Sequence, residues 1–274
     1  MIRRPPRSTL DRSSAASDVY KRQIKMDKSE SSNIVECQNL TLVFGTHEIL
    51  SNASCSIPRN SLTFLVGENG AGKTSLVRSI LGLIPLTTGN IFIHSFEGRQ
   101  PIMGYVPQSV EFPRQFQMTV SEYLNYSASV RKDSVESVLQ KVDFPGSHMN
   151  SRITELSGGE VQKLLLAAEL HRRPDILFLD EPLSNVDDSS EKHIIDVILE
   201  IKNSGVSIVI ITHDWQTVSQ YADHVICLNK NFLCETTESC ICRNSLSKVE
   251  IRNIQKATPD PNTRHEGYCY IENV

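Results

Sequence analysis

Residues 62–74, which read LTFLVGENGAGKT, decide the fold. The last eight of them fit the pattern G-x-x-x-x-G-K-[ST], a loop that binds nucleotide phosphates. The apolar, β-prone run before the loop predicts a buried strand, and the apolar spacing from Ser75 to Ile84 predicts a helix after it. Strand, glycine-rich turn and helix form the context that this pattern needs. The sequence therefore predicts nucleotide binding by an α/β domain.

The residue types of the loop follow from the chemistry of phosphate binding. Glycines allow the backbone to curl, so that successive amide groups point at phosphate oxygens. The start of the following helix adds unpaired N–H donors and a positive dipole end. We expect Lys73 to reach the β- and γ-phosphates and the Thr74 hydroxyl to bind Mg²⁺.

Bulk composition narrows the class of protein. A chain of 274 residues with 39% hydrophobic residues can bury one large or two modest cores. Its net charge of −4 gives a nucleic-acid role no support. The sequence contains no run of about 18 apolar residues that would predict a membrane span. Its seven scattered cysteines favour a reduced, cytosolic compartment over a disulfide scaffold.

The first 25 residues differ from the rest. MIRRPPRSTL resembles the translated start of a sequencing-library adapter, and we interpret residues 1–25 as non-native, disordered read-through before a native start at Met26. A transit peptide or a basic arm is the alternative. This segment carries seven Lys/Arg and two Asp, so its removal would take the net charge from −4 to −9.

Hydrophobic periodicity predicts the remaining elements coarsely. Two short alternating segments within 34–44 suggest a small β region, and helical patterns indicate a helical subdomain at about 109–165. Capping-box pairs mark three helix starts there: Thr119 with Glu122, Asp133 with Glu136, and Ser157 with Glu160. Further strands are expected at 91–94, 102–106, 176–180 and 206–211, and a closing hairpin at 224–234.

Polar residues follow three of these predicted strands. Gln108 comes after Pro107, Asp180 and Glu181 end a wholly apolar run, and His213 follows another. Open α/β sheets bind ligands at the carboxyl edge of their strands, so we expect these side chains to share one site. We also expect strand alternation to point Asp180 and Glu181 in different directions.

The phosphate loop, Gln108, LSGGE at 156–160, ILFLDEP at 176–182 and His213 together resemble the ATP-binding subunit of an ABC transporter. The resemblance covers roughly residues 33–235, and it leaves 236–274 as a C-terminal extension. It implies a P-loop NTPase with a mainly parallel core sheet, a small antiparallel β subdomain and a helical insert. It also implies ATP and Mg²⁺ as ligands.

The resemblance implies a role for each matching position. Glu181 would be the general base, with His213, Lys73 and Gln108 as further catalytic groups. Thr74, Gln108 and Asp180 would hold Mg²⁺ through the nucleotide. The residues expected to contact ATP are Phe44, which would stack on adenine, the loop Gly67, Glu68, Asn69, Gly70, Ala71, Gly72, Lys73, Thr74 and Ser75, and the inter-subunit residues Ser157, Gly158, Gly159 and Asp187.

These roles imply partners. The signature at 156–160 acts on ATP held by the opposite protomer, so a second copy of the chain is expected. An integral membrane permease and, indirectly, an extracytoplasmic substrate-binding protein would complete the complex. Glu160 departs from the Gln that is usual in the family. We expect its side chain to cap its own helix, leaving the Ser157 hydroxyl and the glycine amides to face the nucleotide.

Features of the subgroup narrow the cargo. GYVPQ at 104–108, LSGGEVQK at 156–163 and VICLN at 225–229 are most similar to importers of zinc, manganese and iron. The chain would then lie at the cytoplasmic face of a bacterial inner membrane. An importer for another substrate and a non-transport ABC ATPase are the alternatives. Cysteines 234, 240, 242 and 269 with His265 could form a metal sensor, but their spacing is not a standard zinc pattern, and we interpret them as buried or incidental.

Overall fold

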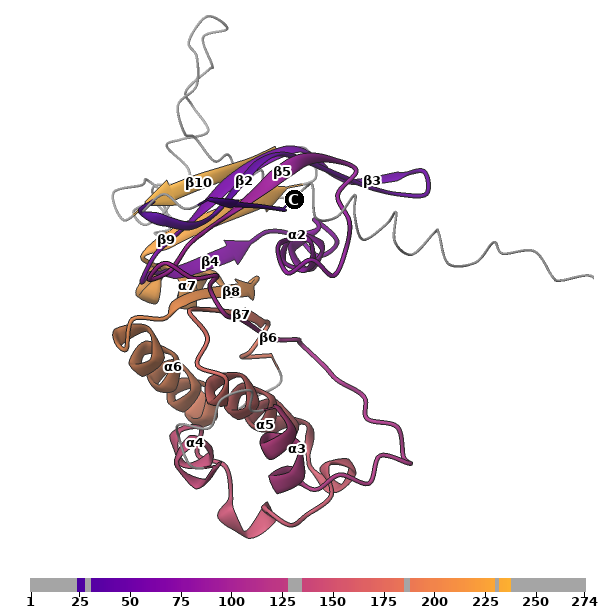
Figure 1. The fold of residues 1–274 in the computed structure, drawn as a ribbon, viewed down its shortest axis with the longest axis vertical. Coiled ribbons are helices and arrows are strands. Elements are labelled where there is room, and N and C mark those ends of the chain that lie inside the picture. The colour runs from indigo at the N-terminus through magenta and orange to yellow at the C-terminus, as the bar shows by residue number, and fades with distance from the viewer. Residues whose placement is uncertain (1–23, 28–30, 128–134, 185–187, 230–231, 238–274) are drawn as a thin grey trace, which may run out of the picture.

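The computed structural model describes residues 24–27, 31–127, 135–184, 188–229 and 232–237 (Figure 1). A six-stranded sheet in the order β10-β9-β4-β8-β7-β6 forms its centre. Five strands run parallel, and β10 pairs antiparallel with β9 at one edge. The strands of this sheet are β4 Leu62–Val66, β6 Met103–Val106, β7 Ile176–Asp180, β8 Ser207–Thr212, β9 His224–Asn229 and β10 Phe232–Thr237.

The central strands β4, β7 and β8 are buried at every position. Such continuous apolar runs are typical of parallel strands that are covered on both faces. The sequence predicted these three strands and the β9–β10 hairpin, and the structure confirms them.

A four-stranded sheet covers one face of the central sheet. Its order is β1-β5-β2-β3, where β2 is antiparallel to β3 and to β5, while β1 runs parallel to β5. The predicted antiparallel subdomain is therefore confirmed, apart from this one parallel pair. The strands are β1 Ile24–Asp27, β2 Asn33–Phe44, β3 His47–Pro58 and β5 Thr88–His94.

The small β region expected at 34–44 is confirmed, but two details differ from the sequence analysis. The two short segments within 34–44 are one strand, β2, because register shifts and the positive φ of Asn39 absorb the break in alternation. The sequence analysis also did not predict β3, which pairs along β2 and is rich in small polar residues. Strand β1, Ile24–Asp27, spans the predicted native start at Met26. That residues 1–25 are non-native stays a prediction.

Helices complete the layers on both sides of the central sheet. Helix α2, Lys73–Ile80, packs with the four-stranded sheet on one face. It begins at Lys73, before the expected span of 75–84, and it ends earlier than that span because the chain turns at Gly82 with φ 75°. The helices on the other face are α5 Gly158–His171, α6 Asp188–Asn203 and α7 Trp215–Tyr221, while α3 Val120–Ser127 and α4 Val135–Lys141 pack against α5.

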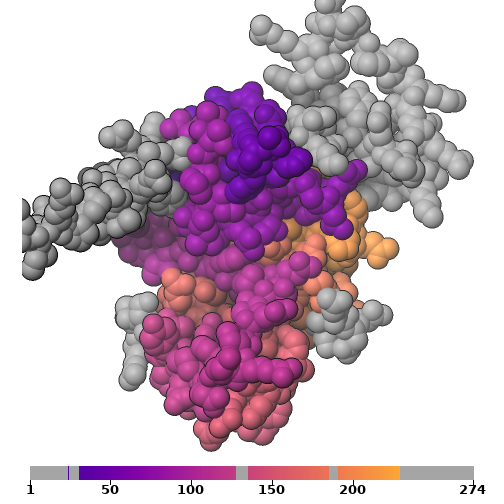
Figure 2. All heavy atoms as spheres, turned by 90° about the vertical axis from the view of Figure 1, so that its right-hand side faces the viewer, coloured from indigo at the N-terminus to yellow at the C-terminus, as the bar shows by residue number. Residues whose placement is uncertain are grey.

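The helical insert between β6 and β7 forms a lobe of its own, with α3, α4, α5 and the short 3-10 helices η1 Gly146–His148 and η2 Ile153–Glu155 (Figures 1 and 2). Thr119 and Glu122 form the predicted capping box of α3. Asp133, expected to cap α4, lies outside the described residues. Among the helices that the structure describes, none is long and apolar enough to cross a membrane.

Candidate active site

The strand register brings the predicted functional residues to one edge of the sheet. Val66 of β4 pairs with Thr212 of β8, and Ile211 of β8 pairs with Asp180 of β7. Leu179 of β7 pairs with Val106 of β6. The phosphate loop, Glu181, His213 and Gln108 follow these strand ends directly, so they leave the sheet at the same edge.

Close backbone approaches fix the shape of the phosphate loop. Gly67 has φ 150°, and a Cβ atom there would lie 2.0 Å from the carbonyl oxygen of Leu228 in β9. Gly72, the N-cap of α2, has φ 97°, and a Cβ atom would lie 2.9 Å from Cγ2 of Ile49. Only glycine meets both requirements without displacing its neighbours. The loop is therefore held between β9 and β3.

The Lys73 side chain folds back into the phosphate loop. Its Nζ donates to the carbonyl oxygens of Gly67 at 2.7 Å and Glu68 at 2.9 Å, and the residue is 7% exposed. Burial lowers the pKa of Lys73, whereas the charges of Glu181 and Asp180 act in the opposite direction. The ammonium group thus lies within the turn that is expected to surround a phosphate.

Thr74 and Asp180 meet as their predicted roles require. The Thr74 hydroxyl donates to Asp180 Oδ2 at 3.0 Å, and the Tyr105 hydroxyl donates to the same oxygen at 3.2 Å. Burial raises the pKa of Asp180, while these two hydrogen bonds work against the rise. A hydroxyl and a carboxylate beside a phosphate site are oxygen donors of the kind that Mg²⁺ prefers, so these residues fit the ion.

Glu181 lies between Gln108 and His213. Gln108 Nε2 donates to Glu181 Oε2, and His213 Nδ1 lies 3.5 Å from Glu181 Oε1. The Glu181 side chain is 16% exposed, whereas that of His213 is 65% exposed. One carboxylate therefore contacts both strand-end residues that the sequence singled out, and the His213 ring remains open to a ligand.

Strand alternation does not separate Asp180 from Glu181, contrary to our expectation. Strand β7 ends at Asp180, and Glu181 has a left-handed backbone with φ 49°. Its N–H donates to the carbonyl oxygen of Ile211 at 3.0 Å, which holds the turn against β8. A non-glycine residue in this conformation stores strain, which is typical of functional sites. The turn, and not the pleat, aims Glu181 at Gln108.

The signature residues lie elsewhere in the chain. Ser157 caps α5 in the helical lobe, whereas the phosphate loop precedes α2 beneath the four-stranded sheet (Figure 1). A Cβ atom added at Gly158 or at Gly159 would meet nothing within 4 Å. Glu160 caps the helix as predicted, since its Oε2 accepts from the Ser157 N–H at 2.8 Å. The Ser157 hydroxyl is not free to face a nucleotide, because it also donates to Glu160 Oε2 at 2.7 Å.

The structure leaves the roles of the other residues expected to contact ATP as predictions. Phe44 ends β2 with an exposed ring, at 46%, so its stacking on adenine stays a prediction. Asp187 lies outside the described residues. Four residues expected to contact ATP lie in the loop or directly after it: Glu68, Asn69, Ala71 and Ser75.

Two residues of these networks were missed. Tyr105 belongs to the GYVPQ stretch, but nothing in its spacing assigned it to Asp180. His148 Nδ1 lies 2.8 Å from Glu160 Oε1, although the two residues are twelve apart in the chain. No local sequence pattern predicts that contact. A histidine in a loop next to a capping box is the one signal that the sequence offered.

Comparison with known proteins gives a consistent result. The family profile described as "ABC transporter" matches residues 50–184. The "Zinc import ATP-binding protein ZnuC" of Wigglesworthia glossinidia brevipalpis is 37% identical over 207 residues, which cover 75% of this chain and 87% of that protein. The protein of the same name from Rickettsia bellii is 36% identical, with 77% and 90% covered.

Solved structures agree on the fold. "Structure of ATP binding subunit of ABC transporter" superposes with a TM-score of 0.67 at 21% identity, covering 77% of this chain and 92% of that one. A dimeric ATP-binding cassette in a post-hydrolysis state, bound to ADP and Pi, superposes with a TM-score of 0.63 at 19% identity, covering 74% and 98%. At such identities the likeness concerns the fold alone.

Proposed function

We propose that this chain, which belongs to the ATP-binding family of ABC transporters, hydrolyses ATP to drive import of zinc or a related divalent metal ion. Membership of the family makes the chain an ATP-binding subunit with ATPase activity coupled to transport, paired with a second ATPase subunit and a membrane permease. The cargo and the identity of the second subunit, which we take to be another copy of this chain, are our inference.

One observation carries the proposed mechanism: Glu181 is held between Gln108 and His213 at the edge where the phosphate loop leaves the sheet. A carboxylate in this position can accept a proton from a water molecule that attacks the terminal phosphate. Gln108 orients the carboxylate by donating to Oε2, and the exposed His213 ring can donate to the γ-phosphate. Lys73 offsets the charge that develops on the phosphoryl oxygens.

Mg²⁺ would be held by the Thr74 hydroxyl and, through its water shell, by Asp180. When bound, the ion neutralises phosphate charge and orients the phosphate oxygens for in-line attack. The protein contributes two hydrogen bonds to Asp180 Oδ2, one from Thr74 and one from Tyr105. They set the direction of that carboxylate before any ion binds.

A complete site requires a second protomer. The loop side of a bound ATP would be contacted by residues 67–75, while Gly158 and Gly159, beside which an added Cβ atom would meet nothing within 4 Å, begin α5 in the helical lobe of the same chain. Head-to-tail pairing about a twofold axis would place the start of one α5 against the ATP of the other protomer. The N-terminus of a helix binds anions well, so α5 suits this role.

The proposed cargo rests on the names of the relatives, and a permease would handle the ion itself. Among the residues that the structure describes, no group of three or more His, Cys, Asp or Glu side chains could hold a metal ion. From the similarity to zinc-import ATP-binding proteins of bacteria, we place this chain at the cytoplasmic face of a bacterial membrane, bound to the permease, with an extracytoplasmic binding protein capturing the zinc, manganese or iron.

The Glu181→Gln variant tests the mechanism. It keeps the shape of the side chain but removes the base, so we expect turnover to fall at least about 100-fold. ATP should then hold the variant as a dimer, measured by size-exclusion chromatography with light scattering. Glu200→Gln, on the exposed face of α6, is the matched control and should retain full activity. Normal hydrolysis by Glu181→Gln would refute the assigned base.

A growth experiment tests the cargo separately. Deleting the gene from its host should slow growth in a chelated medium, and added zinc should restore growth at lower concentration than manganese or iron. Restoration by manganese or iron alone would reassign the cargo while leaving the ATPase mechanism intact. Growth that is unaffected under all three limitations would exclude metal import.

A further inference from the structure

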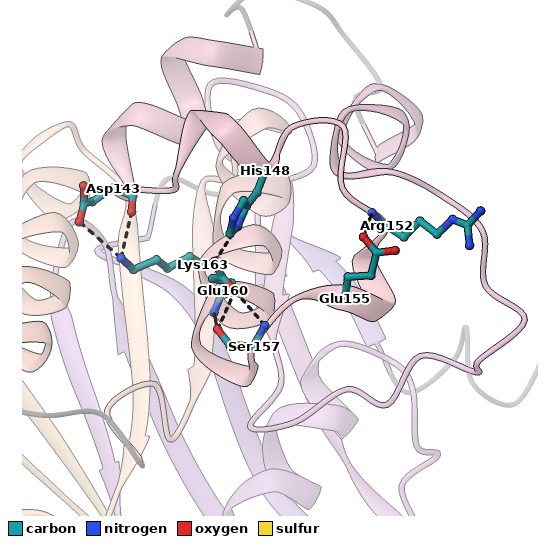
Figure 3. Close-up of polar contacts among 7 residues, drawn as sticks. All are labelled: Asp143, His148, Arg152, Glu155, Ser157, Glu160 and Lys163. Carbon is teal, nitrogen blue, oxygen red and sulfur yellow. Dashed lines mark hydrogen bonds and ion pairs between the residues drawn. The ribbon is translucent and has the colours of Figure 1, made fainter.

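Glu160 lies at the centre of a small polar network at the start of α5. Figure 3 shows its carboxylate between the His148 ring and Ser157. Oε2 accepts from the Ser157 N–H at 2.8 Å and the Ser157 hydroxyl at 2.7 Å, and Oε1 lies 2.8 Å from His148 Nδ1. Glu160 thus links the 3-10 helix η1 to the signature.

The charge state of Glu160 determines how this network works. Hydrogen bonds from the Ser157 amide and hydroxyl, together with the His148 contact, lower the pKa of Glu160, so it is ionised at neutral pH. An ionised carboxylate only accepts hydrogen bonds, so Nδ1 of His148 must carry the proton and donate it. The signature therefore contains a negative charge whose second oxygen is satisfied by a histidine.

Capping alone does not require the histidine. At the start of α3, Glu122 makes the same capping box: its Oε2 accepts from the Thr119 N–H at 2.8 Å and the Thr119 hydroxyl at 3.0 Å. The hydrogen bonds described for Glu122 all go to Thr119. The His148 contact at α5 is thus an addition to an otherwise complete cap.

Other charged groups near Glu160 are engaged elsewhere. Lys163, on the same helix, donates to the Asp143 carbonyl oxygen at 2.9 Å and pairs with its carboxylate at 3.4 Å. Glu155 accepts from the Arg152 N–H, and the Arg152 guanidinium extends away from Glu160 in Figure 3. Among the described residues, the side chain that contacts Glu160 Oε1 is therefore His148.

We propose that His148 is a positioning residue that lets a carboxylate-containing signature close on the ATP of a second copy of this chain. The proposal rests on the ATP-dependent dimer proposed above. By holding Oε1 against η1, His148 fixes the direction of the carboxylate and satisfies its second oxygen. An approaching phosphate then meets donors and not an uncompensated carboxylate.

The same contact keeps Glu160 satisfied during closure. The Ser157 hydroxyl must turn from Glu160 to a phosphate oxygen if it is to bind the nucleotide. After this rotation, Oε2 still accepts from the Ser157 N–H and Oε1 from His148. Both carboxylate oxygens therefore keep a donor. An oxygen without a donor would be costly in a closing interface.

A double-mutant cycle tests the proposal in the full chain. We expect His148→Ala to raise the KM for ATP about fivefold while kcat changes less than twofold, the size expected for one partly exposed hydrogen bond to a carboxylate. In a Glu160→Gln background the same substitution should change KM less than twofold, because no carboxylate remains to be compensated. In the Glu181→Gln background, ATP-dependent dimerisation should weaken by the same factor.

Matched variants distinguish positioning from structure. His148→Asn, which retains a short N–H donor, should restore most of the lost affinity. Lys163→Ala and Glu122→Gln, which alter a neighbouring cation and the equivalent cap, should leave KM within twofold of the parent. Circular dichroism and unfolding in urea verify that each variant is folded.

Two results would overturn the proposal. An equal rise of KM in both backgrounds would mean that His148 acts on the fold and not through Glu160. No change of KM or dimerisation in either background would mean that His148 does not affect ATP binding or closure. Failure of the proposed function is distinguishable, because the parent chain itself would then show neither ATPase activity nor an ATP-dependent dimer.

Discussion

Replacing Gly67 by alanine should damage the chain more than the same change at Gly70, although both belong to the phosphate loop. Both have a positive φ, 150° at Gly67 and 79° at Gly70, so alanine is strained at either position. A Cβ atom at Gly67 would lie 2.0 Å from the Leu228 carbonyl oxygen, whereas at Gly70 it meets nothing within 4 Å. The pair therefore separates steric overlap from backbone strain.

The expected magnitudes follow from these two contributions. Backbone strain alone costs about 1–2 kcal/mol for a non-glycine residue, so Gly70→Ala should lower the free energy of unfolding by that amount. At Gly67 the obstacle is backbone and cannot rotate away, so the loop or β9 must move by about an ångström. Such displacements cost about 1–3 kcal/mol more, and we expect about 2–5 kcal/mol in total.

Urea unfolding of the nucleotide-free protein measures this difference directly. Without ATP the comparison reports the loop's own packing and excludes direct effects of the added methyl groups on phosphate binding. Equal destabilisation by Gly67→Ala and Gly70→Ala would refute the claim that Leu228 constrains the loop. A second comparison, the affinity for ATP, should show a loss for both variants, since both changes strain the backbone of the loop.

Two further predictions concern the strand ends. Tyr105→Phe removes one donor to Asp180 Oδ2 but leaves Thr74, so the Mg²⁺ concentration for half-maximal ATPase should rise about three- to tenfold; an unchanged Mg²⁺ dependence would deny Tyr105 this role. Burial lowers the pKa of His224 from 6.5, so the unfolded chain takes up its proton at a higher pH than the folded chain. Stability is therefore fully present above pH 6.5 and falls as the pH drops toward the folded pKa. His224→Gln should flatten this fall in urea titrations between pH 8 and 5.5, and an identical slope would contradict the assignment.

The sheet edge could be predicted because its determinants are local. Strands β4, β7 and β8 are short apolar runs that end at a loop or at polar residues, and parallel pairing brings such ends together whatever the loops do. Strand β3 escaped prediction for the opposite reason. Its sequence is rich in serine and asparagine, and only the partner β2, with its register shifts, holds it extended.

The failures within the site have a common physical origin. Alternation cannot describe Glu181, because the strand ends one residue earlier and a left-handed turn sets its direction. The capping box correctly placed Glu160, but a capping pattern says only where one carboxylate oxygen goes. The second oxygen is taken by His148, which reaches α5 through a 3-10 turn twelve residues earlier. Contacts between loops have no period, so only the folded chain reveals them.

The Glu160 network also explains how a chain can keep a carboxylate where ATP is expected to bind. Glutamate at the third position of α5 interacts favourably with the helix dipole and caps the helix, which stabilises the free protomer. The same charge opposes an incoming phosphate, so a gain in the free state becomes a cost on closure. A hydrogen-bond donor on the remaining oxygen reduces that cost without removing the cap. His148 meets this requirement because it belongs to η1, outside α5, and it contacts the carboxylate oxygen that the cap leaves over.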